Sequence, residues 1–165
     1  MGGKKAGSRF IAAPTTLRSK VKVGGPGAVD AEALARAEQI IADMADDYLE
    51  WAEDDLLNIA EALDNLKAAR KKDRKEHIER IFQISHDIKG QGGSFGYGMM
   101  TRIANQLCAF VETLESAGAA EIEVLELHID AMKLIIANRL SGEGGQVAKK
   151  LFQNLKKVTE KVAAS

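Results

Sequence analysis

The middle of this chain decides its fold, and there residues 78–96 read IERIFQISHDIKGQGGSFG. Apolar and small residues recur at steps of three and four in the first half of this stretch, at Ile78, Ile81, Ile84, Ser85 and Ile88. This spacing predicts a helix with one buried face. Glycines then become dense, and we expect the helix to end near Gly96.

The same helical spacing continues on both sides. It predicts one or two helices over residues 30–66, with Asp30 as the N-cap, and further helices over 99–118, around 124–136 and over 145–162. Connections this short make consecutive helices antiparallel neighbours. We therefore predict an all-α fold, an antiparallel four-helix bundle with additional flanking helices, whose core spans about residues 43–140.

The charges divide the chain into two parts. Residues 1–29 hold six basic residues, no acidic residue and both prolines, and they are predicted to form a flexible basic arm. Residues 30–165 hold the other 17 basic residues and all 24 acidic ones, and they are assigned to the helical bundle. A basic arm permits non-specific binding to nucleic acid, and this remains one alternative function. The acidic body does not favour it, and we expect no specific nucleic-acid partner.

Several classes of protein are excluded. No apolar run approaches the roughly 18 residues of a membrane span, and the first ten residues lack the apolar stretch of a secretory signal, so we expect a cytoplasmic protein without membrane contact. The single cysteine, Cys108, cannot form an internal disulfide, and the three histidines lack the spacing of a zinc site. The glycine run is not a dinucleotide loop, because Phe95 occupies the position of its last glycine and a helix precedes it.

His86 is the candidate reactive group. Lys89, Gly90 and Gly93 follow it at three, four and seven residues and share its helix face, away from the isoleucine stripe. Each helical glycine costs roughly 1 kcal/mol relative to alanine, so Gly90, Gly92 and Gly93 indicate a purpose other than local stability. An exposed neutral imidazole can attack an activated phosphoryl group, and an ammonium beside it can neutralise the phosphoryl oxygens. The bare backbone would let another protein approach closely.

The run His86-Asp-Ile-Lys89-Gly90-x-x-x-x-Phe-Gly96 resembles the signature of histidine phosphotransfer domains, and it is similar to the phosphorylated domain of chemotaxis-type kinases. The resemblance implies a helical bundle that carries a phosphoryl group on the Nε2 atom of His86. It assigns phosphoryl support to Lys89, a cleared docking face to Gly90 and the end of the helix to Gly96. Chemotaxis-type domains often orient this histidine with a glutamate on the next helix. Here Cys108 occupies that position, which leaves Asn105 or Gln106 as candidates.

By this resemblance the protein is a phosphorelay carrier between aspartates of response-regulator receiver domains, with a hybrid histidine kinase as a further partner. It would be a monomer without an ATP-dependent kinase segment and without a cofactor or metal of its own. Mg²⁺ is expected on the receiver only, because Asp87 points about 100° away from His86 on the helix. The alternative is a non-phosphorylated helical adaptor that binds a kinase or receiver through the glycine-rich face.

The partner-docking surface is predicted to include apolar contacts from Phe82 and from Met99 or Met100. Its specificity is assigned to the surrounding polar residues, Glu79, Gln83 and Arg102. Trp51, Met99 and Met100 are interpreted as core or helix-junction residues and Cys108 as a small buried apolar residue. His77 is interpreted as solvated and His128 as a helix-face residue rather than a ligand.

Overall fold

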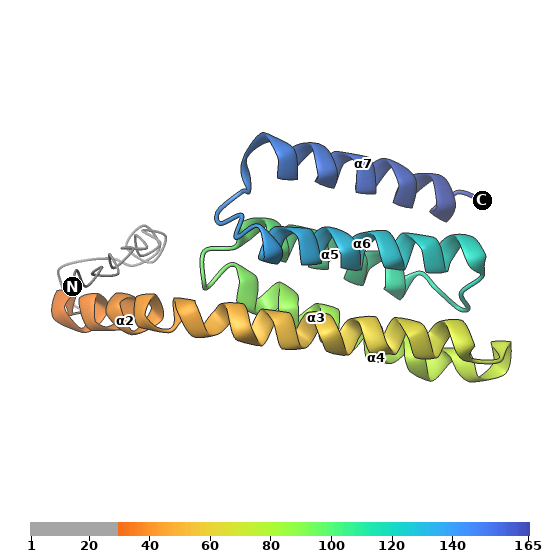
Figure 1. Ribbon diagram of the computed structural model, residues 1–165, viewed down its shortest axis with the longest axis horizontal. Helices are drawn as coiled ribbons and strands as arrows, with labels where there is room; N and C mark the ends of the chain where they lie inside the picture. Colours follow the sequence, from red (N-terminus) through yellow and green to blue (C-terminus); the bar gives the residue numbers. More distant parts are fainter. Residues whose placement is uncertain (1–29) are drawn as a thin grey trace, which may run out of the picture.

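The computed structural model describes residues 30–165, which contain helices and no strand (Figure 1). Four helices form the bundle: α3 (Ala45–Ala68), α4 (Arg74–Gly92), α5 (Gly98–Glu112) and α6 (Ala119–Ala137). Each packs against the next along the chain, and α6 closes the bundle against α3. The predicted fold class is therefore confirmed. The predicted basic arm, residues 1–29, lies outside the described residues.

The described helices form three layers (Figure 1). The pair α3 and α4 makes one layer, the pair α5 and α6 lies against it, and α7 (Gly145–Ala163) covers the far side. Among the described helices, α7 packs only against α5 and α6. It begins after a loop in which Gly142 and Gly144 adopt the left-handed conformation that favours glycine.

The N-terminal helix α2 (Ala31–Asp43) projects beyond the bundle and contacts only α3 among the described helices (Figure 1). Its N-cap is Asp30, as predicted, because the Asp30 carboxylate accepts a hydrogen bond of 3.0 Å from the Glu32 N–H. The periodicity predicted either one helix or two over this segment, and the break at Met44 divides it into two helices. The helix α2 is therefore an extension of the bundle rather than one of its members.

The isoleucine stripe of α4 lies in the core, as its spacing predicts. Ile81 and Ile88 are fully or almost fully buried, at 0% and 2% exposed. Ser85 is also buried, and its hydroxyl donates a 2.6 Å hydrogen bond to the Ile81 carbonyl. The polar group is thus satisfied within its own helix, which allows a serine to occupy a core position.

The turn between α4 and α5 differs slightly from expectation. The helix α4 ends at Gly92, four residues before the predicted end, and a turn covers residues 93–96. Gly96 has φ +82°, and the Tyr97 N–H donates a 2.8 Å hydrogen bond to the Gly92 carbonyl across this turn. That bond closes the helix as in a Schellman motif. Gly96 therefore reverses the chain, although the regular helix has already ended.

The helix α5 also ends earlier than predicted, at Glu112 instead of near Gly118.

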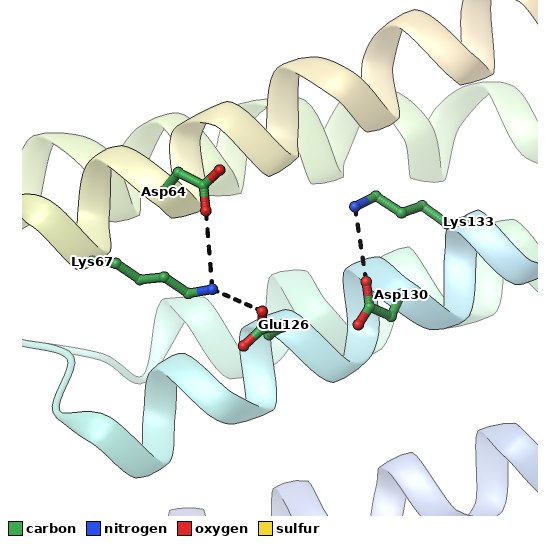
Figure 2. Close-up of polar contacts among 5 residues, drawn as sticks. All are labelled: Asp64, Lys67, Glu126, Asp130 and Lys133. Carbon is green, nitrogen blue, oxygen red and sulfur yellow. Dashed lines mark hydrogen bonds and ion pairs between the residues drawn. The ribbon is translucent and has the colours of Figure 1, made fainter.

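Exposed ion pairs join the outer faces of α3 and α6. The Nζ atom of Lys67 lies 2.7 Å from Glu126 Oε1 and 3.9 Å from Asp64 Oδ1 (Figure 2). The bond to Glu126 raises the pKa of Lys67. A further pair within α6 joins Asp130 and Lys133 at 3.8 Å. Exposed pairs of this kind contribute little to stability, so the bundle depends mainly on its apolar core.

The residues singled out as core or helix-junction residues differ in burial. Trp51 is 40% exposed and makes an edge contact with Phe95, in the turn between α4 and α5, at 5.9 Å between ring centroids, so of the two alternatives it is a helix-junction residue. Met99 and Met100 are fully buried, as expected. His128 is fully buried rather than merely on a helix face. Its Nδ1 bonds to the Val124 carbonyl at 2.8 Å, and burial lowers its pKa.

Residues 30–165 contain neither a membrane-spanning helix nor a cluster of metal-binding side chains. No helix among them is long and apolar enough to cross a membrane. They also bring together no group of three or more His, Cys, Asp or Glu side chains that could hold a metal ion.

Candidate functional site

His86 lies on the outer side of α4 and is exposed, as its position relative to the isoleucine stripe predicts. Its neighbour Ser85 and the next-turn residue Ile88 face the core. Phe82 lies one turn earlier on the same face, half-buried, with its ring centroid 6.1 Å from that of His86. Within the described chain the imidazole makes no hydrogen bond. Helix α4 alone therefore positions the ring and presents it to solvent.

A groove of about 560 Å³ runs between α4 and α5 beside this imidazole. From α4 it is lined by Arg80, Phe82, Gln83, His86, Asp87 and Lys89. From α5 it is lined by Asn105, Cys108, Ala109 and Glu112. Two cationic and two anionic side chains share this lining, so the groove carries mixed charge around a single imidazole.

Lys89 shares the groove with His86, so the predicted pair is brought together. The ammonium lies close enough to Cys108 to act on that thiol, because it opposes the rise in the Cys108 pKa that burial causes. The backbone of Lys89 is anchored to the next helix, since Thr101 Oγ1 donates a 3.0 Å hydrogen bond to its carbonyl. Among the described residues, Lys89 forms no ion pair. Its charge is therefore available to an anion in the groove.

The three glycines of the run have different surroundings. A Cβ atom added at Gly90 would meet nothing within 4 Å, and Gly93 is exposed. A Cβ atom at Gly92 would lie 2.9 Å from Thr101 Oγ1 and 3.1 Å from Met100 Cβ. Gly92 is therefore needed for the close packing of α4 and α5, whereas Gly90 and Gly93 leave the surface beside His86 bare.

The family model of the Hpt domain matches residues 43–139, which is more than half of the chain. The chain belongs to the Hpt domain family. No curated protein and no solved structure matches it. Hpt domains are phosphotransfer carriers rather than kinases, and they act with kinases and receiver domains in phosphorelay signalling. The match covers the four-helix bundle and leaves out α7 and most of α2.

The α5 position at which the resemblance leads one to expect a glutamate facing His86 carries no carboxylate. Cys108 lies there, buried below the groove, as predicted for a small apolar residue. Asn105 lines the groove, but Gln106 points to the other side of α5, where its Nε2 lies 3.4 Å from Thr159 Oγ1. Gln106 is therefore the wrong candidate for orienting His86. Glu112 also lines the groove, one helical turn after Cys108, a spacing that would have predicted its place there.

The predicted docking residues of this Hpt domain are partly brought together. Phe82 and Gln83 line the groove, and Glu79 is exposed outside it. Met99 and Met100 are wrong as docking residues, because both are fully buried below the turn.

Arg102 faces away from the His86 groove. Its NH1 lies 2.7 Å from Glu143 Oε2, and its guanidinium lies 4.5 Å from the centroid of the Phe152 ring. It contributes to a second groove, which adjoins the first and lies between α5 and α7.

Asp87 follows His86 on α4, about 100° further around the helix, and it also lines the groove. The Asp87 charge also acts on α3, because it adds to the burial that raises the pKa of Asp55, while Arg80 opposes the shift. The groove beside His86 therefore includes a carboxylate that also influences α3.

Proposed function

We propose that this Hpt domain is a phosphoryl carrier in which His86 accepts a phosphoryl group from an aspartate of one receiver domain and passes it to an aspartate of another. The observation that carries the proposal is an exposed imidazole in a groove that also contains Lys89, which forms no ion pair with any residue from 30 to 165. A hybrid histidine kinase would supply the phosphoryl group through its own receiver domain.

The nucleophile in the chemical step is the neutral imidazole of His86. The lone pair of His86 Nε2 attacks the phosphorus of an aspartyl phosphate, and a P–N bond forms as the P–O bond to the aspartate breaks. The aspartate leaves as a carboxylate with the bonding electron pair, and Nδ1 keeps its proton. Attack by a second aspartate on the phosphohistidine reverses these changes, so the transfer is reversible.

Lys89 would stabilise this transfer electrostatically. Its ammonium shares the groove with His86 and forms no ion pair within the described chain, so it can offset the negative charge of the phosphoryl oxygens. In our proposal the Mg²⁺ that such transfers require is held by the receiver domain, and this chain supplies neither a metal nor a cofactor.

Gly90 and Gly93 would set how closely the receiver approaches. Neither carries a side chain, and the space beside Gly90 is open to 4 Å. The receiver backbone can therefore come within van der Waals contact of α4 next to His86. Phe82 adds a half-buried apolar contact to the same surface.

The test is transfer of labelled phosphoryl groups from a panel of phosphorylated receiver domains to the wild-type protein and to His86→Gln. The matched control is His77→Gln, because His77 lies on the same helix outside the groove. We expect label on the wild type and on His77→Gln as an adduct that is labile in acid and stable in base. His86→Gln should remain unlabelled while keeping the wild-type helix content by circular dichroism.

Two outcomes would contradict the proposal. Label that persists on His86→Gln would place the phosphoryl group elsewhere in the chain. A folded wild type that takes label from no receiver, yet still binds a receiver or kinase through the glycine-rich face, would favour the non-phosphorylated adaptor.

A further inference from the structure

A second groove, of about 410 Å³, lies between α5 and α7. Its α7 side consists of residues at helical spacing that begin with Phe152 and continue through Lys156 and Thr159. Its lining is mainly apolar by area, with cationic groups from Arg102 and Lys156 and one anionic group from Glu160. Two contacts hold the walls together: Arg102 lies over the Phe152 ring, and Gln106 bonds to Thr159.

This groove is continuous with the His86 groove. Asn105 and Ala109, one turn apart on α5, line both. Both residues are exposed, and the short side chain of Ala109 separates the two grooves only slightly. The surface formed by α4, α5 and α7 is therefore a single docking surface with two hollows, and His86 lies in one of them.

The dimensions allow one partner to cover both hollows. Packed helices lie about 8–10 Å apart, so the axis of α7 is roughly 20 Å from that of α4 across α5. A standard protein interface covers about 800 Å² on each partner, which corresponds to a patch roughly 30 Å across. A domain that brings its aspartate to His86 and spreads over α5 would therefore reach the second groove.

We propose that the receiver domain docked on His86 also occupies the groove between α5 and α7, so that α7 takes part in choosing the receiver. This inference rests on the proposed function. The part of the receiver that enters would carry an apolar side chain next to an acidic one. The apolar lining fits the former, and Lys156, whose only ion pair in the described chain is a long 3.8 Å contact with Glu160, fits the latter.

The helix α7 lies outside the residues that match the Hpt family, so this surface is an addition to the shared bundle. It is also strongly basic, with five lysines and one glutamate over its 19 residues. Electrostatic complementarity of this kind governs the choice and speed of association more than the chemistry that follows.

The test is a matched pair of charge reversals, Lys156→Glu and Lys157→Glu. Both lysines are exposed on α7, but only Lys156 lines the groove. The rate of phosphoryl transfer from a receiver that labels the wild type is measured against protein concentration. For Lys156→Glu we expect the half-saturating concentration to rise at least about fivefold with the maximal rate unchanged, and the rise to shrink at high salt. Lys157→Glu should stay within about twofold of the wild type, since its charge lies off the groove.

Equal behaviour of the two variants would overturn this inference while leaving the proposed function intact. A fall in the maximal rate without a change in half-saturation would also overturn it, because docking would then be unaffected. If no receiver transfers its phosphoryl group to the wild type, the proposed function and this inference fail together. Thermal melting of both variants, compared with the wild type, is the control for folding.

Discussion

Single glycines in α4 have opposite structural roles although they lie two positions apart. Gly90 faces open space, and Gly92 lies against Thr101 and Met100 of α5. In the sequence alone, both glycines lower the helix propensity of α4 to the same extent. Only the packing partner on α5 separates a glycine that serves docking from one that serves the bundle.

This contrast predicts stability changes of opposite sign. Gly90→Ala should raise the free energy of unfolding by about 0.5–1 kcal/mol, because alanine lowers the entropy cost of forming the helix and meets no neighbour. Gly92→Ala should lower it by about 1–3 kcal/mol, because its Cβ atom would overpack the contact with Thr101 and Met100. Urea denaturation measures both values. A loss of stability in both variants would show that the site of Gly90 is not open.

The helices differ in how far their inner faces could be derived from the sequence. In α4, Ile81, Ser85 and Ile88 repeat at helical spacing and are all buried, so the pattern located both the helix and its buried face. Gln106 was misplaced because periodicity groups residues on a face without saying which neighbour covers it. Gln106 turns toward α7, a helix outside the family match. For Trp51 the pattern left the core and the helix junction open, and the contact with Phe95 decides for the junction. The grooves themselves depend on how α4, α5 and α7 pack, which no local pattern contains.

The helix α6 packs against three other helices, α3, α5 and α7. Its His128 is fully buried, and Nε2 has no hydrogen-bond partner among the described residues. Burial lowers the pKa of His128, partly opposed by the bond to the Val124 carbonyl. Acid therefore protonates this imidazole more readily in the unfolded chain than in the folded one.

The consequence is a loss of stability on acidification. As the pH falls below about 6.5, the unfolded state binds the proton first, and the free energy of unfolding should fall by up to about 1.4 kcal/mol per pH unit. His128→Leu should reduce this slope, whereas His77→Gln should leave the His128 contribution in place. Melting temperatures measured across this pH range give the difference between variants. An unchanged slope in His128→Leu would exclude His128 as its source.

At the scale of the whole molecule, α7 joins the bundle through a small number of buried side chains. Leu155 is 4% exposed and belongs to the same core as α5 and α6, whereas Val147 is 66% exposed. We expect Leu155→Ala to lower the free energy of unfolding by about 2–4 kcal/mol and Val147→Ala to have little effect. Unfolding should remain a single transition by circular dichroism and by calorimetry. A separate early transition in Leu155→Ala would mean that α7 unfolds independently of the bundle.

The loop before α7 also holds the turn that follows the histidine helix. The Gly142 N–H donates to the Gly96 carbonyl, and the Met99 N–H donates to the Gly142 carbonyl at 3.0 Å. These two bonds join backbone segments more than forty residues apart in the chain. We therefore expect opening of the turn after α4 to accompany release of the loop before α7, with the amide protons of Gly142 and Met99 exchanging with solvent in the same event. The turn that ends the His86 helix is thus held by a part of the chain outside the residues that match the Hpt family.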